Sequence, residues 1–162
     1  AVIAVNSAMT GHLVLSSVHA NTAPAVIPRM IDLGTEAFLL ASTLNLVIAQ
    51  RLVRVLCPKC KTTATLDPLL IKQLAGHRLP AVVPASKGCA HCHHTGFRGR
   101  SGIFELMPID DRIRELVISK ASTHQFRQIA RQSGYKSMLE DGLVKVAAGV
   151  TTIPEVLRVI SE

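Results

Sequence analysis

Aromatic residues are scarce in this chain. Its 162 residues include no Trp, one Tyr and four Phe. Proteins that bind single-stranded nucleic acids stack bases on aromatic side chains, so this composition disfavours that class. With 48% apolar and 18% charged residues, the sequence predicts a globular protein whose core is built from Leu, Val, Ile and Ala.

Long apolar runs are missing as well. The longest covers residues 37–49 and contains Ser42, Thr43 and Asn45, whereas a membrane-spanning helix needs about 20 apolar residues. The run therefore predicts a buried helix. The N-terminus has no Met, no basic region and no cleavage signature, so it does not resemble a signal peptide, and we expect the chain to be a piece of a longer protein.

Acidic residues are fewer than Lys and Arg, and the formal net charge is +7. Lys and Arg are scattered, with the densest groups at residues 51–61 and 98–100. A basic balance suits anionic partners such as phosphates, acidic protein faces or a bilayer surface, but it selects none of them. Solvated surface charge is the simplest interpretation.

The first third of the chain predicts three helices and one strand. The first helix covers the small, apolar residues 1–9 and is ended by a turn at Thr10 and Gly11. Residues 12–19 have the β-branched content and length of a buried strand. Asn21 and Thr22 can cap a helix that starts near Ala23 and ends at Gly34. A third helix is expected from about residue 36 to residue 56 because its first half is apolar almost all round.

Proline and glycine punctuate residues 57–100, which show little periodic pattern beyond a short helical segment at 68–74. This predicts a loop-rich inserted module. Residues 101–107 then alternate like a strand.

Four helices are expected in the last part of the chain. Asp110 can cap the first, and capping boxes at Ser122–Gln125 and Thr152–Glu155 open the second and the fourth. The third covers about residues 137–148. Together they predict a C-terminal helical bundle.

All four cysteines fall in two Cys-x-x-Cys pairs. Cys57 with Cys60, and Cys89 with Cys92, can each direct two thiolates at one ion. Zinc takes four such ligands at about 2.3 Å in a tetrahedral array, so the pairs predict one structural Zn²⁺ site with no open position. In a loop-rich segment, that metal would supply folding energy that a small core cannot.

Other interpretations of the cysteines are weaker. Disulfides need an oxidising compartment, which nothing in the sequence indicates. A redox Cys-x-x-Cys has no need of a second pair. An iron–sulfur cluster is the main alternative to zinc. The neighbouring histidines His91, His93 and His94 can also bind zinc, but with four thiolates present they are expected at the surface or as outer donors.

Two further histidines, His12 and His19, bracket the apolar segment near the N-terminus. They are either strand-end residues bonded to backbone or a functional pair. Their odd separation places them on opposite faces of a regular strand, so a shared site requires one of them to lie beyond the strand end.

Four segments together resemble the secretion ATPase family that drives type II secretion and type IV pilus assembly. Residues 8–22 (Ala-Met-Thr-Gly-His-Leu-Val-Leu-Ser-Ser-Val-His-Ala-Asn-Thr) are similar to the family's His box. Residues 49–60 resemble the entry into its tetracysteine zinc module, residues 96–106 the strand that leaves it, and residues 141–152 its C-terminal helices. The resemblance covers essentially the whole chain.

This resemblance implies an α/β fold, namely the C-terminal portion of a RecA-like ATPase domain with an inserted zinc-binding module and a C-terminal helical bundle. The expected divisions are residues 1–56 for the latter part of the nucleotide-binding domain, 57–100 for the zinc module and 101–162 for a strand and the helical region. By the same resemblance, the tetracysteine insertion marks extension and secretion motors, whereas pilus retraction motors lack it.

The resemblance also implies roles for residues of the His box. His12 and His19 correspond to catalytic residues near the nucleotide phosphates, where an imidazole can sense or stabilise phosphate charge. Thr10 and Gly11 would lie near the nucleotide. The implied parent is a homo-hexamer that is cytoplasmic and peripheral to the inner membrane. It works with an inner-membrane platform protein and cytoplasmic assembly proteins. No nucleic-acid partner is expected.

One element of that chemistry is missing. ATP hydrolysis in this class requires a Gly-rich loop ending in Gly-Lys-Ser/Thr to bind phosphates and place Mg²⁺. The pattern Gly-x-x-x-x-Gly-Lys-Ser/Thr occurs nowhere in the sequence, and in the family it lies upstream of the region that this chain resembles. We therefore expect the parent to bind ATP and Mg²⁺ and to hydrolyse ATP, and this chain alone to be inactive.

Two other functions fit part of the sequence. The charge and the four cysteines also suit a zinc-ribbon nucleic-acid-binding module, but that alternative explains neither the histidine segment nor the C-terminal helices. A thiol redox protein is the third possibility. It would contain no metal.

Overall fold

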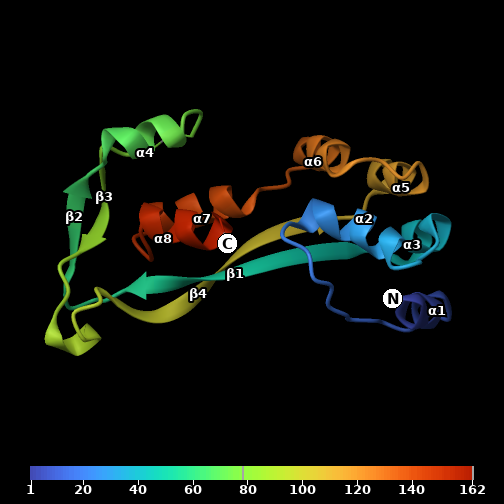
Figure 1. The fold of residues 1–162 in the computed structure, drawn as a ribbon, viewed down its shortest axis with the longest axis horizontal. Coiled ribbons are helices and arrows are strands. Elements are labelled where there is room, and N and C mark those ends of the chain that lie inside the picture. Colours follow the sequence, from blue (N-terminus) through green and yellow to red (C-terminus); the bar gives the residue numbers. More distant parts are fainter. Residues whose placement is uncertain (78, 162) are drawn as a thin grey trace. The chain divides into compact units, whose positions relative to one another are not determined.

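The computed structural model describes residues 1–77 and 79–161 (Figure 1). It divides into two compact units, one made of residues 1–49 and 105–136 and the other of residues 50–104 and 137 onward. The elements are α1 (Val2–Met9), α2 (Ala23–Asp32), α3 (Ala37–Thr43), β1 (Leu46–Leu56), β2 (Lys61–Thr65), α4 (Pro68–Gln73), β3 (Val82–Ser86), the 3₁₀ turn η1 (Ala90–Cys92), β4 (Phe97–Pro108), α5 (Asp111–Ile118), α6 (Thr123–Gln132), α7 (Met138–Ala147) and α8 (Ile153–Ser161).

The strands β1 and β4 form a two-stranded sheet and pass from one unit into the other. Ile109 N donates to Asn45 O at one end of the pair (3.0 Å), and Cys57 N donates to Gly96 O at the other (3.0 Å). The strands are therefore antiparallel. β4 contains the strand predicted at residues 101–107 and is longer at its start.

β1 replaces most of the helix predicted for residues 36–56. α3 ends at Thr43, whose hydroxyl donates to Leu39 O (2.7 Å), and the chain is extended from Leu46 onward. Val, Ile and Leu dominate this stretch, and such residues suit a strand as well as a buried helix. Of the helices that the structure describes, none has the length and apolarity needed to cross a membrane.

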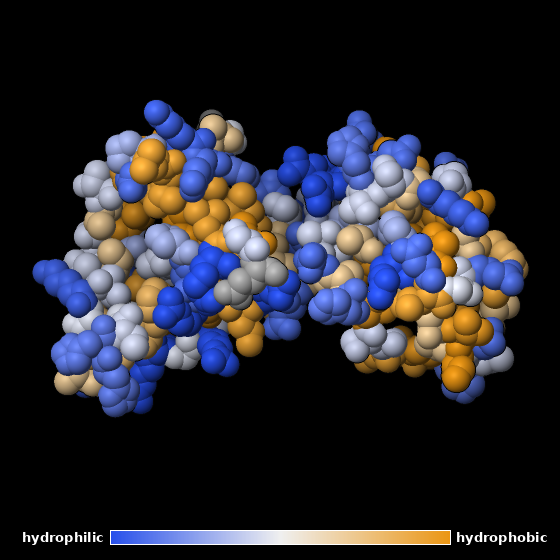
Figure 2. Space-filling model, in the orientation of Figure 1, coloured by the Kyte–Doolittle hydropathy of each residue, from blue (hydrophilic) through white to orange (hydrophobic). Residues whose placement is uncertain are grey.

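The predicted strand at residues 12–19 is absent. Residues 13–20 are neither helix nor strand, and the side chains of Leu13 and Leu15 are 88% and 89% exposed. A strand requires a neighbour for its backbone N–H and C=O groups, and within the described residues none pairs with this segment. Figure 2 shows that apolar residues remain on the surface.

The first unit has a mainly aliphatic core that includes two aromatic side chains, Phe126 and Tyr135. α3 packs on α5, and α6 contacts both α2 and α5. The predicted caps are confirmed: Asp110 accepts from Ile113 N (2.9 Å), and Ser122 with Gln125 forms a capping box. The buried side chains are Ala23, Ile27, Leu40, Ala41, Val47, Met107, Ile109, Ile113, Val117, Phe126, Ala130 and Tyr135.

The second unit combines a hairpin with the helices α4, α7 and α8. β2 and β3 are antiparallel, with Lys61 opposite Ser86 and Thr65 opposite Val82. The sequence did not predict this hairpin, which joins its strands through α4. α7 packs on α8 and also contacts β3.

The structure assigns the four C-terminal helices to two different units, so the predicted C-terminal bundle is not confirmed. α5 and α6 belong to the first unit and α7 and α8 to the second. Likewise, the two units divide the chain within β1 and β4, not at residues 56 and 100. The three-part division given above stays a prediction about domain organisation in the parent.

Candidate metal centre and histidine segment

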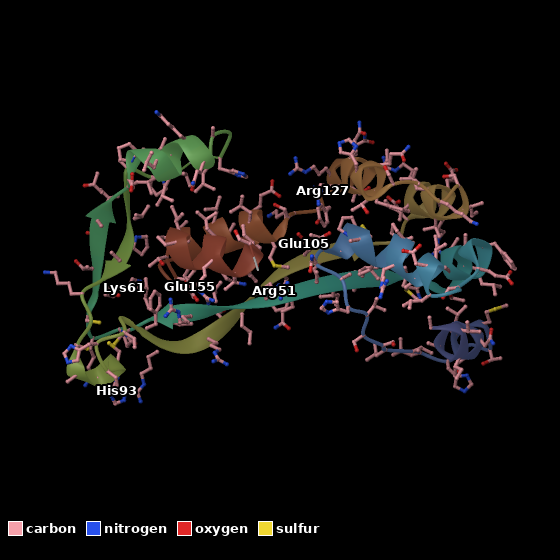
Figure 3. The ribbon with its side chains drawn as sticks, in the orientation of Figure 1. Arg51, Lys61, His93, Glu105, Arg127 and Glu155 are labelled. Atoms are coloured by element: carbon pink, nitrogen blue, oxygen red, sulfur yellow. The ribbon has the colours of Figure 1, made fainter. Side chains whose placement is uncertain are left out.

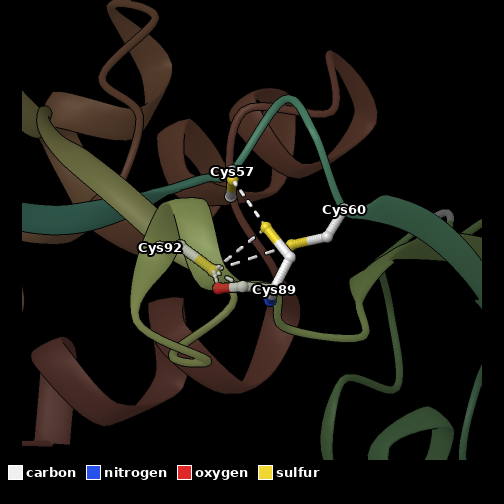
Figure 4. Close-up of side chains that lie close together, drawn as sticks. All are labelled: Cys57, Cys60, Cys89 and Cys92. Atoms are coloured by element: carbon white, nitrogen blue, oxygen red, sulfur yellow. Dashed lines mark hydrogen bonds between the residues drawn. The ribbon is translucent and has the colours of Figure 1, made fainter.

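The four cysteines converge on one point in the second unit (Figure 4). Cys57 follows β1 directly, Cys60 lies in the turn before β2, Cys89 precedes η1 and Cys92 is its last residue. Their sulfur atoms all lie within 4.8 Å of one another. All four thiols are free, with no disulfide among them.

Backbone hydrogen bonds shape each cysteine pair into a tight turn. In the first pair, Cys57 O accepts from Cys60 N (3.3 Å) and Lys61 N (3.0 Å). In the second, Cys92 Sγ accepts from Cys89 N and Gly96 N, both at 3.3 Å. These N–H groups point at the sulfur atom, as expected for a metal-binding thiolate.

These hydrogen bonds and burial give Cys60 and Cys92 different pKa values. Burial would raise the pKa of Cys92, but the N–H groups of Cys89 and Gly96 lower this pKa to about 6. Burial, together with hydrogen bonds to the other three thiols, raises the pKa of Cys60 to about 12. A thiolate therefore forms readily at Cys92, whereas Cys60 must lose its proton as a metal binds.

The sulfur spacing matches a tetrahedral metal site. Four sulfur atoms at about 2.3 Å from one ion lie about 3.8 Å apart. The Sγ atoms of Cys89 and Cys92 are 3.8 Å apart, those of Cys60 and Cys92 3.8 Å, and those of Cys57 and Cys89 4.0 Å. Four thiolates in this geometry can hold a metal ion, and Zn²⁺ and iron are the metals that such a set favours.

The histidines beside the second pair do not join the cluster. Arg98 Nη1 lies 2.7 Å from His91 Nε2 and donates to His91 O (3.3 Å). Burial and the charges of Arg98 and Lys59 lower the pKa of His91. His93 and His94 are exposed and adopt left-handed backbone conformations that close the turn (φ 51° and 58°).

The predicted His-box residues lie in the first unit. Thr10 Oγ1 donates to Ser7 O (2.8 Å) and lies 2.9 Å from His12 Nδ1, and Gly11 adopts a φ of +90° that suits glycine. His12 and His19 are both exposed. Among the described residues, no hydrogen bond joins the two imidazoles.

A cavity of about 550 Å³ lies beneath this segment. Val14, Val18 and His19 line it from the segment, and Met30 and Leu40 line it from α2 and α3. Its walls are mostly apolar, so it is not shaped for a phosphate group.

Two buried carboxylates were not singled out from the sequence. Glu105 is 4% exposed and accepts from Ala23 N (2.8 Å). Glu155 is 2% exposed and was interpreted only as half of a capping box. A signal for Glu105 is its register: it occupies an inward position of a strand, in alternation with Ile103 and Met107.

Comparison with known proteins identifies the family. The family model described as "Type II/IV secretion system protein" matches residues 1–158. The chain is 46% identical over 161 residues to type II secretion system protein E of Pseudomonas aeruginosa, covering 99% of this chain and 32% of that protein. It is 42% identical to the type II secretion system ATPase E of Vibrio cholerae (99% of this chain, 32% of that protein) and 42% identical to the type IV pilus assembly ATPase TfpB of Acinetobacter baylyi (98% and 28%).

The chain thus spans about a third of the length of these relatives. The Vibrio cholerae and Acinetobacter baylyi relatives are named as ATPases of secretion and pilus assembly, which does not favour a zinc-ribbon nucleic-acid-binding module. The match across nearly the whole chain, together with the clustered cysteines, shows that this chain belongs to the type II/IV secretion system protein family.

Proposed function

We propose that this chain is part of a hexameric ATPase motor that powers type II secretion or type IV pilus assembly at the cytoplasmic side of the inner membrane. The observation that carries this proposal is the family match over residues 1–158, shared with relatives named as ATPases of both systems. The inner-membrane platform protein and cytoplasmic assembly proteins are the proposed partners.

In this proposal the first unit is part of a RecA-like domain. Residues 13–18 support it, because they have the composition of a buried strand, lie outside helix and strand, and expose Leu13 and Leu15 almost completely. A strand supplied by the rest of the parent would pair with their free backbone and cover these side chains.

His12 and His19 act beside the phosphates of ATP, with Thr10 and Gly11 nearby. Both imidazoles are exposed and lie outside regular structure, so they are accessible to a ligand. An imidazole N–H can donate to a phosphate oxygen and stabilise the charge that develops there during hydrolysis. Mg²⁺ and the phosphate-binding loop come from the parent, because no Gly-x-x-x-x-Gly-Lys-Ser/Thr pattern is present in this chain.

The four cysteines hold a structural Zn²⁺. The sulfur spacing supports this, and four thiolates leave no position for a substrate or a reactive water. The ion would tie the end of β1 to the start of β4 across the loop-rich residues 58–96. Its role in the motor is therefore to keep this module folded, and it takes no part in hydrolysis.

The test compares ATP hydrolysis by the 162-residue chain with hydrolysis by the full-length parent. We expect none from the chain alone, and we expect His12→Ala and His19→Ala each to lower kcat of the parent by about tenfold or more. His124→Ala is the control, because His124 is exposed on α6, outside the segment. Wild-type rates in both His-box variants, or robust hydrolysis by the isolated chain, would refute the proposal.

A further inference from the structure

Glu105 is a carboxylate in a place where charged side chains are rare. It is 4% exposed and lies on β4, two residues before the fully buried Met107. Acidic residues are almost never this buried unless they are paired or hydrogen-bonded. The hydrogen bonds that Glu105 makes therefore indicate what role this carboxylate has in the fold.

One such hydrogen bond comes from the first residue of α2, which lies 82 residues earlier in the chain. Ala23 N donates to Glu105 Oε2 at 2.8 Å, and Figure 3 shows Glu105 on β4 beside this helix. The N-terminus of a helix carries a partial positive charge and unpaired N–H groups, both of which favour a carboxylate.

The local sequence does not cap this helix itself. Thr22 is the N-cap residue, but its side chain makes no capping hydrogen bond. Pro24 has no N–H group to donate, and Ala25 N donates to Thr22 O (3.1 Å). Ala23 N–H is thus the first-turn donor that needs an outside acceptor, and Glu105 provides it.

The histidine segment ends directly at this capped helix. Only residues 20–22 separate His19 from Ala23, and residues 13–20 have no helix or strand of their own. A segment of this kind is positioned mainly through its two ends, which here are the turn at Thr10 and the start of α2. Four Cα–Cα steps join His19 to Ala23, so the two residues stay within about 14 Å of each other. The position of Ala23 therefore limits the space that His19 can reach.

We propose that Glu105 is a positioning residue for His19: it fixes the start of α2 on β4 and so holds the imidazole where the nucleotide phosphates are to bind. This inference rests on the proposed role of His19 in ATP hydrolysis. Glu105 itself touches no nucleotide in the proposal and acts only through the helix.

The experiment measures kcat, the KM for ATP, hexamer assembly and melting temperature in the full-length parent. Glu105→Ala should lower kcat by roughly tenfold or more, because small displacements of a catalytic group are costly. Glu105→Gln keeps an acceptor oxygen at the same place and should retain kcat within about twofold. Ala23→Pro removes the same hydrogen bond from the donor side, at a helix position that proline tolerates, and should reproduce the loss.

A double-mutant cycle separates positioning from general destabilisation. In a His19→Ala background, Glu105→Ala should cause little further loss of kcat, because its effect passes through the missing imidazole. The matched control is Asp110→Ala, which removes a cap in the same unit, away from the histidine segment. It should lower the melting temperature with kcat unchanged.

The outcomes distinguish the two proposals. If His19→Ala hydrolyses ATP at the wild-type rate, the proposed role of His19 is wrong and this inference falls with it. If His19→Ala is impaired but Ala23→Pro or Glu105→Ala assembles and keeps the wild-type kcat, only the positioning role is overturned. Additive losses in the double variant, or no rescue by Glu105→Gln, also overturn it.

Discussion

Three hydrogen bonds join Arg54 to Glu155, although the two residues lie 101 positions apart in the chain. Arg54 donates to Glu155 Oε2 from Nε (3.0 Å) and from Nη2 (2.6 Å), and its backbone N donates to Oε1 (3.1 Å). Arg158 donates to the same carboxylate, and Thr151 Oγ1 donates to Arg54 O (2.8 Å). The contact ties α8 to the end of β1, three residues before Cys57.

The first prediction concerns acid sensitivity. Although burial raises the pKa of Glu155, hydrogen bonds from Arg158 and Arg54 lower it from 4.5 to about 2. Because the folded-state pKa is depressed, the stabilisation is fully present above about pH 4.5 and is lost as the pH falls toward 2. Glu155→Gln should lower the free energy of unfolding by about 1–3 kcal/mol at pH 7. The effect is limited to this range because Arg54 and Arg158 are partly exposed and solvent weakens the ion pairs.

Denaturant unfolding of wild type and Glu155→Gln from pH 7 to pH 3 tests this. The difference between them should shrink as the pH falls. Glu115→Gln removes an exposed carboxylate on α5 and should change stability by less than about 0.5 kcal/mol at every pH. A Glu155→Gln difference that is constant with pH would contradict the ion-pair account.

Glu155 also shows where sequence reasoning ends. Its spacing from Thr152 predicts a capping box, and Glu155 N does lie 3.4 Å from Thr152 Oγ1. The carboxylate, however, accepts hydrogen bonds from Arg54, a partner too distant in sequence for any local pattern to predict. The caps at Asp110 and Ser122 are predictable because both partners lie within one turn.

The same contrast explains the errors in secondary structure. The cysteine cluster follows from two-residue spacing and one preferred metal geometry, and the structure confirms it. The helix predicted over residues 36–56 and the strand over 12–19 depend instead on which neighbours the segments meet. β1 has β4 as a partner, whereas residues 13–20 have none within the described chain, and composition alone does not supply that information.

The second prediction is that the metal centre behaves as a folding unit. Cys57→Ser in the full-length protein should reduce bound zinc from about one ion per chain to nearly none, because a site with three thiolates binds far more weakly. Hydrogen exchange should increase first in β2, β3 and the turn around η1. Metal analysis and exchange measured by mass spectrometry report both effects.

His91→Ala is the control for that experiment. The His91 ring contacts Arg98 and not the cysteine sulfurs, so the variant should keep its zinc. If His91→Ala loses the ion and Cys57→Ser keeps it, the ligand set assigned to the site is wrong.

The third prediction concerns the contact between α7 and α8. A Cβ added at Gly142 would lie 2.5 Å from Val156 Cγ1, and Val156 is fully buried. Gly142→Ala should therefore destabilise the protein by about 1–3 kcal/mol, even though alanine is the better helix former. Val156→Ala opens the space, so the double variant should be more stable than the sum of the two single effects. Strict additivity in thermal unfolding would show that the helices pack differently.

The fourth prediction uses two glycines of the cysteine module with similar backbones. Gly88 and Gly99 have φ values of +79° and +85°, so alanine carries a similar conformational cost of about 1 kcal/mol at each position. Their surroundings differ. A Cβ at Gly88 would lie 2.6 Å from His94 O, a backbone atom of the second cysteine turn, whereas a Cβ at Gly99 meets nothing within 4 Å.

Gly88→Ala must therefore push apart the turn that positions Cys89 and Cys92, and it should release zinc to a chelator at least about tenfold faster than Gly99→Ala. Release is followed with a colorimetric chelator on the full-length protein. Both variants share the left-handed strain, so the ratio of their rates isolates the steric effect on the metal turn. Equal rates would mean that the turn accommodates the added Cβ without moving the thiolates. The metal, and not the close approach of Gly88 to His94, would then set the shape of this turn.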